Sequence, residues 1–243
     1  MLEDFYVDFR PFVESSRLFS IIHLQWKGQL GSGFIALIGN GQCWVTARHV
    51  IEGALAGDEL LVFNDNQWKT LKLIEVFHST VERDVSVFTT NVRFNFAKPI
   101  DLSDLGSVRL GQNIIAFGFP HGIIQLGIDG IKSPTPLCKS GSFAGVLEAT
   151  QGQVLLMDAL INPGFSGGPV FYCDHHTKTT KVLGIVSALR PEEGELGSIY
   201  DTSTTPPIKL PNLKTFVHSG FTYLVPIKEA RDLAGQLTKF PSN

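Results

Sequence analysis

The segment NPGFSGGPVF, residues 162–171, carries the most informative pattern in this chain. Three glycines and two prolines surround Ser166. A serine hydroxyl is a poor nucleophile unless a base removes its proton and hydrogen-bond donors stabilise the oxyanion. Gly164 can adopt a backbone conformation that directs its N–H toward a substrate, where a side chain would obstruct it. The segment predicts a nucleophile turn, with an ordinary tight turn between two strands as the alternative.

A general base and a carboxylate that orients it are expected elsewhere in the chain. His49 follows the hydrophobic run of residues 31–47, at the start of an expected helical turn, and Asp84 opens the apolar run VSVF. Taken alone, each residue is more often structural or merely exposed. The order His49, Asp84, Ser166, with gaps of 35 and 82 residues, matches the order of the chymotrypsin-type triad. This order favours nucleophilic catalysis, and His78 and Asp101 are the next residues to test if Asp84 is not the carboxylate.

The other histidines are interpreted as structural or exposed residues. His175 and His176 are adjacent and lack further ligand-like spacing, so we expect no metal site and no cofactor. The set comprises His23, His78, His121, His175, His176 and His218.

Composition excludes several classes of protein. Of the 243 residues, 43% are apolar and 18% are charged, which is typical of a globular chain. The net charge of −3 provides no basic field, so we expect no nucleic-acid partner. Three cysteines make no disulfide framework and fit a reducing compartment. The N-terminus has no basic and apolar leader pattern, and no apolar run reaches the ~18–20 residues of a membrane span. We therefore expect a cytoplasmic protein without a membrane span.

Short apolar runs rich in β-branched and aromatic residues are separated by turn residues and predict an all-β protein. The expected strands include residues 18–26, 33–38, 43–47, 60–63, 85–88, 114–119, 144–149, 154–160, 182–189 and 221–226. The one expected helix follows Pro226, where Ile227, Ala230 and Leu233 recur at helical spacing. The stretches 120–141 and 190–219 are expected to be long loops. The stretch 91–107 could join two halves of similar size.

These segments resemble, in matching order, those of trypsin-like serine proteases, and most of all the HtrA/DegP branch. The matching segments are GSGF (31–34), VTARHV (45–50), RDVSVF (83–88), DALINPGFSGGPV (158–170), LGIVSA (183–188) and FTYLVPIKEARDL (221–233). The resemblance implies two packed six-stranded antiparallel β-barrels with a C-terminal helix and the active site between them. The expected division is an N-terminal arm at 1–17, one barrel at 18–105 and a second barrel with the helix at 106–243.

The same resemblance assigns roles to individual residues. His49, Asp84 and Ser166 would form the triad, and the N–H groups of Gly164 and Ser166 the oxyanion hole. Substrate would contact the following residues: Leu160, Ile161, Ser187, Ala188 and Leu189. Because Phe165 stands where digestive relatives carry an aspartate, zymogen activation through a new N-terminus is not expected. The chain is also expected to carry neither the signal peptide nor the PDZ domain of those relatives.

The resulting functional hypothesis is a serine endopeptidase that cleaves after small or medium aliphatic residues. A catalytically silent pseudoprotease that binds peptides or proteins is the alternative, and an esterase is a weaker third. The stretch 190–219 is expected to control access to the site, with an activating protein partner as one way to order it. The aromatic segment 2–13 either builds a homo-oligomer or packs on the chain's own barrel.

Overall fold

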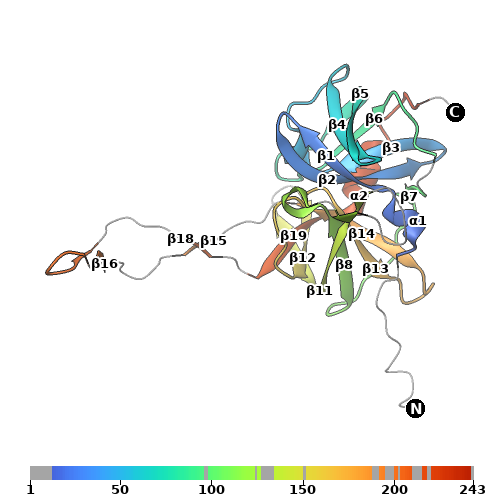
Figure 1. Ribbon diagram of the computed structural model, residues 1–243. Coiled ribbons are helices and arrows are strands. Elements are labelled where there is room, and N and C mark those ends of the chain that lie inside the picture. Colours follow the sequence, from blue (N-terminus) through green and yellow to red (C-terminus); the bar gives the residue numbers. More distant parts are fainter. Residues whose placement is uncertain are drawn as a thin grey trace, which may run out of the picture.

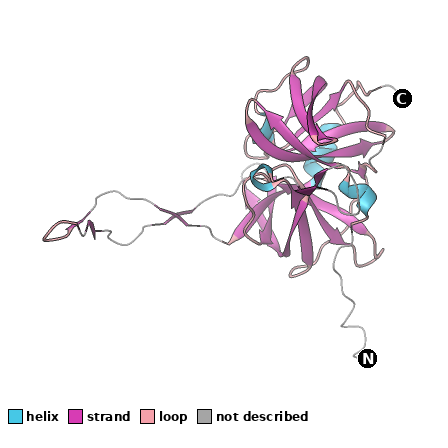
Figure 2. Ribbon diagram, viewed as in Figure 1, coloured by secondary structure: helices cyan, strands magenta, loops and turns pink. Residues whose placement is uncertain are grey.

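The computed structural model describes residues 13–95, 98–123, 125–126, 134–149, 152–187, 192–194, 200–201, 203–209, 215–217 and 220–241. These residues form two closed six-stranded antiparallel β-barrels and a short C-terminal helix (Figures 1 and 2). The fold class expected from the sequence is confirmed. The strands of the barrels fall within 18–105 and 106–243, while the domain boundaries themselves stay a prediction.

The N-terminal barrel runs in the order β1-β4-β5-β6-β3-β2 and closes through the pairing of β1 with β2. β7 joins the outside of β2 in parallel. Large side chains such as Leu24, Trp44 and Phe88 fill the interior. The strands are β1 (Ile21–Trp26), β2 (Gln29–Ile38), β3 (Gly41–Thr46), β4 (Glu59–Asn64), β5 (Gln67–His78), β6 (Ser86–Thr90) and β7 (Ile100–Asp101).

The C-terminal barrel closes in the order β11-β12-β19-β14-β13-β8. Its interior contains Met157, Val170 and Leu224, among others. The 3₁₀ turn η3 (Pro120–Gly122) follows β8. The barrel strands are β8 (Asn113–Gly118), β11 (Leu137–Ala149), β12 (Gly152–Asp158), β13 (Pro169–Cys173), β14 (Thr180–Val186) and β19 (Phe221–Pro226).

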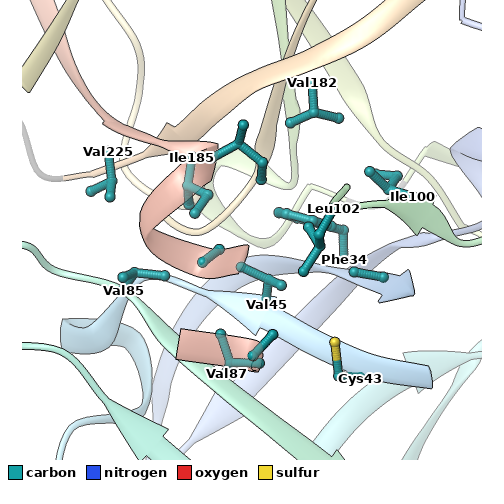
Figure 3. Packing of buried hydrophobic residues seen from close by; sticks show 14 of the residues in the cluster. Phe34, Cys43, Val45, Val85, Val87, Ile100, Leu102, Val182, Ile185 and Val225 are labelled. Atoms are coloured by element: carbon teal, nitrogen blue, oxygen red, sulfur yellow. The ribbon is translucent and has the colours of Figure 1, made fainter. Parts of the chain in front are cut away.

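A third apolar cluster joins the two barrels. Val45 and Val87 of the N-terminal barrel lie in one buried cluster with Ile185 and Val225 of the C-terminal barrel (Figure 3). The helix α2 (Ile227–Ala234) lies between the barrels and buries Ile227, Ala230 and Ala234 in the same cluster (Figure 1). Buried apolar area of this kind holds the barrels in one arrangement, so that residues on both can contribute to a single site.

The structure corrects three sequence-based expectations. β5, with 12 residues, has no counterpart among the expected strands, because charged and polar residues interrupt its apolar ones. The expected strand at 18–26 begins only at Ile21, since Leu18 ends the one-turn helix α1 (Ser15–Leu18). The expected loop 120–141 ends at Leu137, where β11 begins, and contains the short antiparallel pair β9 (Gln125–Leu126) and β10 (Pro134–Thr135).

The stretch 190–219 contains two short antiparallel pairs where the structure describes it. β15 (Glu192–Gly194) pairs with β18 (Thr215–Val217), and β16 (Tyr200–Asp201) pairs with β17 (Ile208–Lys209). The two pairs are separate two-stranded sheets among the described residues. Figure 1 shows these strands to one side of the C-terminal barrel.

The start of the chain is described from Val13 onward. Val13 and Leu18 pack against the cluster between the barrels, and Arg17 donates a hydrogen bond to the carbonyl of Thr180 at 2.9 Å. Residues 2–12 of the segment proposed for self-association lie outside the described residues.

Candidate active site

The candidate base and its carboxylate lie at adjacent ends of two paired strands. β3 and β6 are antiparallel neighbours, with Thr46 opposite Ser86. η2 (Arg48–Ile51) follows β3 and carries His49, and Asp84 lies just before β6. Because the end of one antiparallel strand adjoins the start of the other, the fold brings these two residues together from 35 positions apart.

His49 and Asp84 are joined through both the ring and the backbone. Nδ1 of His49 lies 2.9 Å from Oδ2 and 3.0 Å from Oδ1 of Asp84. The backbone N–H of His49 donates to Oδ1 at 3.0 Å. Asp84 adopts a φ of +40°, which is uncommon for a residue with a side chain. These contacts hold the imidazole in one orientation, with Nε2 on the side of the ring away from the carboxylate.

Ser187, just beyond the end of β14, provides a further contact to this pair. Its hydroxyl donates to Oδ2 of Asp84 from the C-terminal barrel. Burial raises the pKa of Asp84, but the hydrogen bonds and charge of His49, together with the Ser187 hydroxyl, outweigh burial and leave this pKa below its ordinary value. Asp84 is therefore held as a carboxylate that can stabilise a protonated His49. The sequence suggested only a substrate contact for Ser187.

The loop that carries Ser166 connects β12 to β13 and depends on two glycines. Gly164 has a φ of +101°, and a Cβ there would lie 2.5 Å from the carbonyl oxygen of Phe119. Gly167 has a φ of +87°, and a Cβ there would lie 2.0 Å from the carbonyl oxygen of Ser32. Only glycine fits both the backbone conformation and the space, so the glycines of the motif are required by the packing of the loop.

Two N–H groups of this loop have no hydrogen-bond acceptor among the described residues. The carbonyl of Pro163 accepts from the N–H of His121 at 3.0 Å, and the carbonyl of Phe165 accepts from the N–H of Gly168 at 2.8 Å. In the part of the chain that the structure describes, neither the Gly164 nor the Ser166 N–H has a hydrogen-bond acceptor. Donors without an acceptor among the described residues are available to stabilise an oxyanion.

The remaining residues expected at the site are placed as follows. Leu160 is 48% exposed, whereas Ile161 is 4% exposed and belongs to the interior of the C-terminal barrel. Ala188 and Leu189 lie outside the described residues. His78 and Asp101 have other partners: the His78 ring contacts Ser86 and the carbonyl of Ala54, and Asp101 accepts from Ser103. Neither contacts His49.

A match to a protein-family model gives the family of this chain. A family model described as "Trypsin-like peptidase domain" matches residues 31–204, which include all three candidate residues. The chain belongs to the trypsin-like peptidase family. Within the family its relatives are of the HtrA/DegP type, as the sequence motifs suggested.

Two curated relatives illustrate the similarity. A probable periplasmic serine endoprotease, DegP-like, of Halomonas elongata is 28% identical over 215 residues, which cover 88% of this chain and 36% of that protein. The serine protease Do-like HtrA of Bacillus subtilis is 31% identical over 164 residues, covering 65% of this chain and 33% of that protein. The chain therefore spans about a third of the length of these relatives and corresponds to their protease region.

Solved structures support the same fold. The HtrA-type protease AlgW with a tripeptide aligns over 91% of this chain and 60% of its own, with a TM-score of 0.58 and 20% identity. A serine endoprotease from Yersinia pestis aligns over 93% of this chain and 66% of its own, with a TM-score of 0.56 and 18% identity.

The described residues offer neither a metal site nor a membrane-spanning helix. They contain no group of three or more His, Cys, Asp or Glu side chains able to hold a metal ion. No helix in the described part of the chain has the length and hydropathy needed to cross a membrane.

Proposed function

We propose that this trypsin-like peptidase domain is a serine endopeptidase that uses Ser166 as nucleophile, His49 as general base and acid, and Asp84 as the residue that orients His49. The observation that carries the proposal is the double contact between His49 and Asp84 combined with the two unpaired N–H groups on either side of Phe165. The His49–Asp84 pair would transfer the proton, and the two N–H groups would stabilise the charge of the oxyanion. Acyl transfer needs both.

The proposed reaction proceeds in two halves. Ser166 Oγ forms a bond to the scissile carbonyl carbon while its proton passes to Nε2 of His49, and the carbonyl oxygen becomes an oxyanion facing the N–H groups of Gly164 and Ser166. The C–N bond then breaks, and His49 gives the proton to the leaving amine. Water repeats these steps on the acyl-enzyme and releases the acid. Ser166, His49, the peptide substrate and one water molecule supply every atom and proton in these reaction steps.

The proposed substrate is a peptide with a small or medium aliphatic residue at P1. The resemblance to the family places Leu160 and Ile161 in the wall of the S1 pocket, and Leu160 is the member of this pair with an exposed side chain. One methylene in such a pocket changes binding by about 1–3 kcal/mol, so selectivity should be modest.

Regulation, assembly and location are further parts of the proposal. We propose that the stretch 190–219 controls access to the active site, either directly or after a protein partner orders it, since it follows the segment of Ser187 closely in the chain. Homo-oligomerisation through residues 2–13 and a cytoplasmic location are proposed on the sequence arguments alone.

A fluorophosphonate probe and a peptide library test this function. The probe should label wild-type protein at Ser166, and the library should be cleaved after aliphatic residues. Ser166→Ala should abolish both signals, while Ser140→Ala, an exposed serine of β11, should change neither. Binding of library peptides without labelling or cleavage, with and without candidate activators, would instead favour the pseudoprotease. Cleavage of esters alone would favour the esterase.

A further inference from the structure

Ser32 of β2 reaches across from the N-terminal barrel to the loop that carries Ser166. Its hydroxyl donates to the carbonyl of Gly164 at 2.7 Å and accepts from the N–H of Phe119 at 2.9 Å. Its backbone N–H donates to the carbonyl of Ser166 at 2.8 Å. Ser32 is completely buried, and the Thr46 hydroxyl holds its carbonyl at 2.6 Å. A single residue thus contacts both ends of the segment that holds the two candidate oxyanion donors.

The geometry of the peptide bond explains why these contacts matter for the donors. In a trans peptide the C=O of one residue and the N–H of the next share a plane and point in opposite directions. The bond from His121 N–H to the Pro163 carbonyl therefore fixes where the Gly164 N–H points. The bond from Gly168 N–H to the Phe165 carbonyl likewise fixes the Ser166 N–H.

The peptide plane between these two is the one that Ser32 holds. The Gly164 carbonyl shares its plane with the N–H of Phe165, which donates to the carbonyl of Asn162 at 3.3 Å, a longer contact than the Ser32 bond. Gly164 gives this plane wide rotational freedom. The plane joins both outer planes, at Gly164 and at Phe165, so its rotation would strain the two outer bonds and displace the Gly164 and Ser166 N–H groups that those bonds orient. The donors to the outer planes are backbone groups, whereas Ser32 holds the middle plane with a side chain.

We propose that Ser32 is a positioning residue that keeps the Gly164 and Ser166 N–H groups directed at one oxyanion. It acts from the opposite barrel and gives a role to the GSGF segment that the triad does not use. This inference rests on the proposed endopeptidase function for its kinetic consequence, but the conformational consequence can be measured without any turnover.

The kinetic experiment compares Ser32→Ala with Ser20→Ala on the full chain. Ser20 is also completely buried, and its hydroxyl donates to the carbonyl of Lys98, far along the chain from the nucleophile loop. We expect Ser32→Ala to lower kcat about 10-fold with KM nearly unchanged, and to weaken a peptide aldehyde, which forms a tetrahedral adduct, by a similar factor. Ser20→Ala should retain wild-type kcat and aldehyde affinity.

The conformational experiment measures ¹⁵N relaxation dispersion in the same variants. Ser32→Ala should show new microsecond-to-millisecond exchange at the amides of Gly164, Phe165 and Ser166, which Ser20→Ala should lack. If the alanine variant fails to fold, Ser32→Cys replaces the hydroxyl with a thiol that is a weaker hydrogen-bond partner, and should give the same exchange.

The outcomes distinguish failure of the positioning role of Ser32 from failure of the proposed endopeptidase function. Equal kinetics and equal amide dynamics for the Ser32 and Ser20 variants would overturn the role of Ser32 while leaving the endopeptidase intact. An inert wild-type protein whose loop nevertheless gains exchange in Ser32→Ala would overturn the proposed function and retain the positioning role.

Discussion

The His49–Asp84 pair and the loop from Pro163 to Ser166 are held by different kinds of contact. In the pair, the reactive side chains themselves make the bonds, between an imidazole and a carboxylate whose pKa is lowered. In the loop, backbone carbonyls are bound by donors from η3, from β2 and from the loop itself, and the Ser166 hydroxyl takes no part in these bonds.

This difference predicts how each region responds to substitution. In the pair, changing one side chain removes both the chemistry and the contact that supports it. In the loop, the donors belong to the backbone, so the sensitive positions include those where the backbone needs glycine, the buried Phe165 and the contacts from Ser32. Substitutions in the pair should therefore cost more activity than substitutions in the loop or behind it.

The triad substitutions should have the largest effects. Ser166→Ala and His49→Ala should each lower kcat about 10⁶-fold, and the double variant should lose little more, because the residues act as one unit. Asp84→Asn should lower kcat about 10⁴-fold through the wrong imidazole tautomer. Steady-state kinetics on a library-derived peptide measures all four variants. Asp101→Asn, whose side chain bonds only within its own turn, is the matched control and should behave as wild type. Additive losses in the double variant would contradict a single unit.

Gly164→Ala should have the next largest effect and acts on the loop alone. A Cβ at this position meets the carbonyl of Phe119 at 2.5 Å and the N–H of His121 at 2.9 Å, so the backbone must move and one oxyanion donor is lost. We expect kcat to fall about 10²–10³-fold with little change in KM. Gly220→Ala is a control at a positive φ with open space around it. Full activity of Gly164→Ala would show that this N–H does not face the oxyanion.

Ser187→Ala tests whether the pair depends on the opposite barrel as the loop does. Loss of the hydroxyl removes one contribution that lowers the pKa of Asp84, so kcat should fall about 10-fold and this pKa should rise. Folding lowers the pKa of Asp84, so the ionised Asp84 carboxylate stabilises the folded state. This stabilisation is complete above the unfolded pKa of about 3.9 and disappears as the pH falls through the folded pKa.

The stability difference between wild type and Ser187→Ala should therefore be largest at neutral pH and shrink toward pH 3. Urea unfolding at several pH values measures it. A difference that stays constant across this range would mean that Ser187 stabilises the fold without acting on Asp84.

Substitution of His23 should have the smallest effect on activity and a measurable effect on stability. Its ring stacks on Phe119 at 5.1 Å, behind the nucleophile loop, and among the described residues neither ring nitrogen has a hydrogen-bond partner. Burial lowers the pKa of His23 to about 4. Between about pH 6.5 and pH 4 the unfolded chain binds a proton that the folded chain does not, so stability should fall as pH falls.

His23→Phe should remove this dependence. The variant should gain up to about 3 kcal/mol of unfolding free energy over wild type as pH falls from 6.5 to 4, with kcat at pH 8 unchanged. A wild-type protein whose stability is as flat as that of His23→Phe over this range would show that the ring is hydrated or partnered in solution.

The sequence predicted the candidate site residues but missed one strand and one contact of the site. The motif around Ser166 and the order of His49, Asp84 and Ser166 identified the family, because the chemistry of acyl transfer restricts which residue types can occur there. β5 and the hydroxyl contact of Ser187 were missed. In β5, apolar residues alternate with charged ones on the barrel exterior. Nothing in a chain pattern shows that a serine 103 positions away lies beside Asp84.

The all-β class, the glycine-rich turn around Ser166 and the helix after Pro226 can be predicted from the chain alone, because each depends on local backbone preference or periodicity. By contrast, the contacts that Ser32 and Ser187 make across the two barrels appear only once the barrels are packed together. Their partners are a backbone carbonyl 132 positions away and a carboxylate 103 positions away. Such contacts depend on how two closed barrels pack around one apolar cluster, and the packing of distant surfaces leaves no periodic trace in the chain.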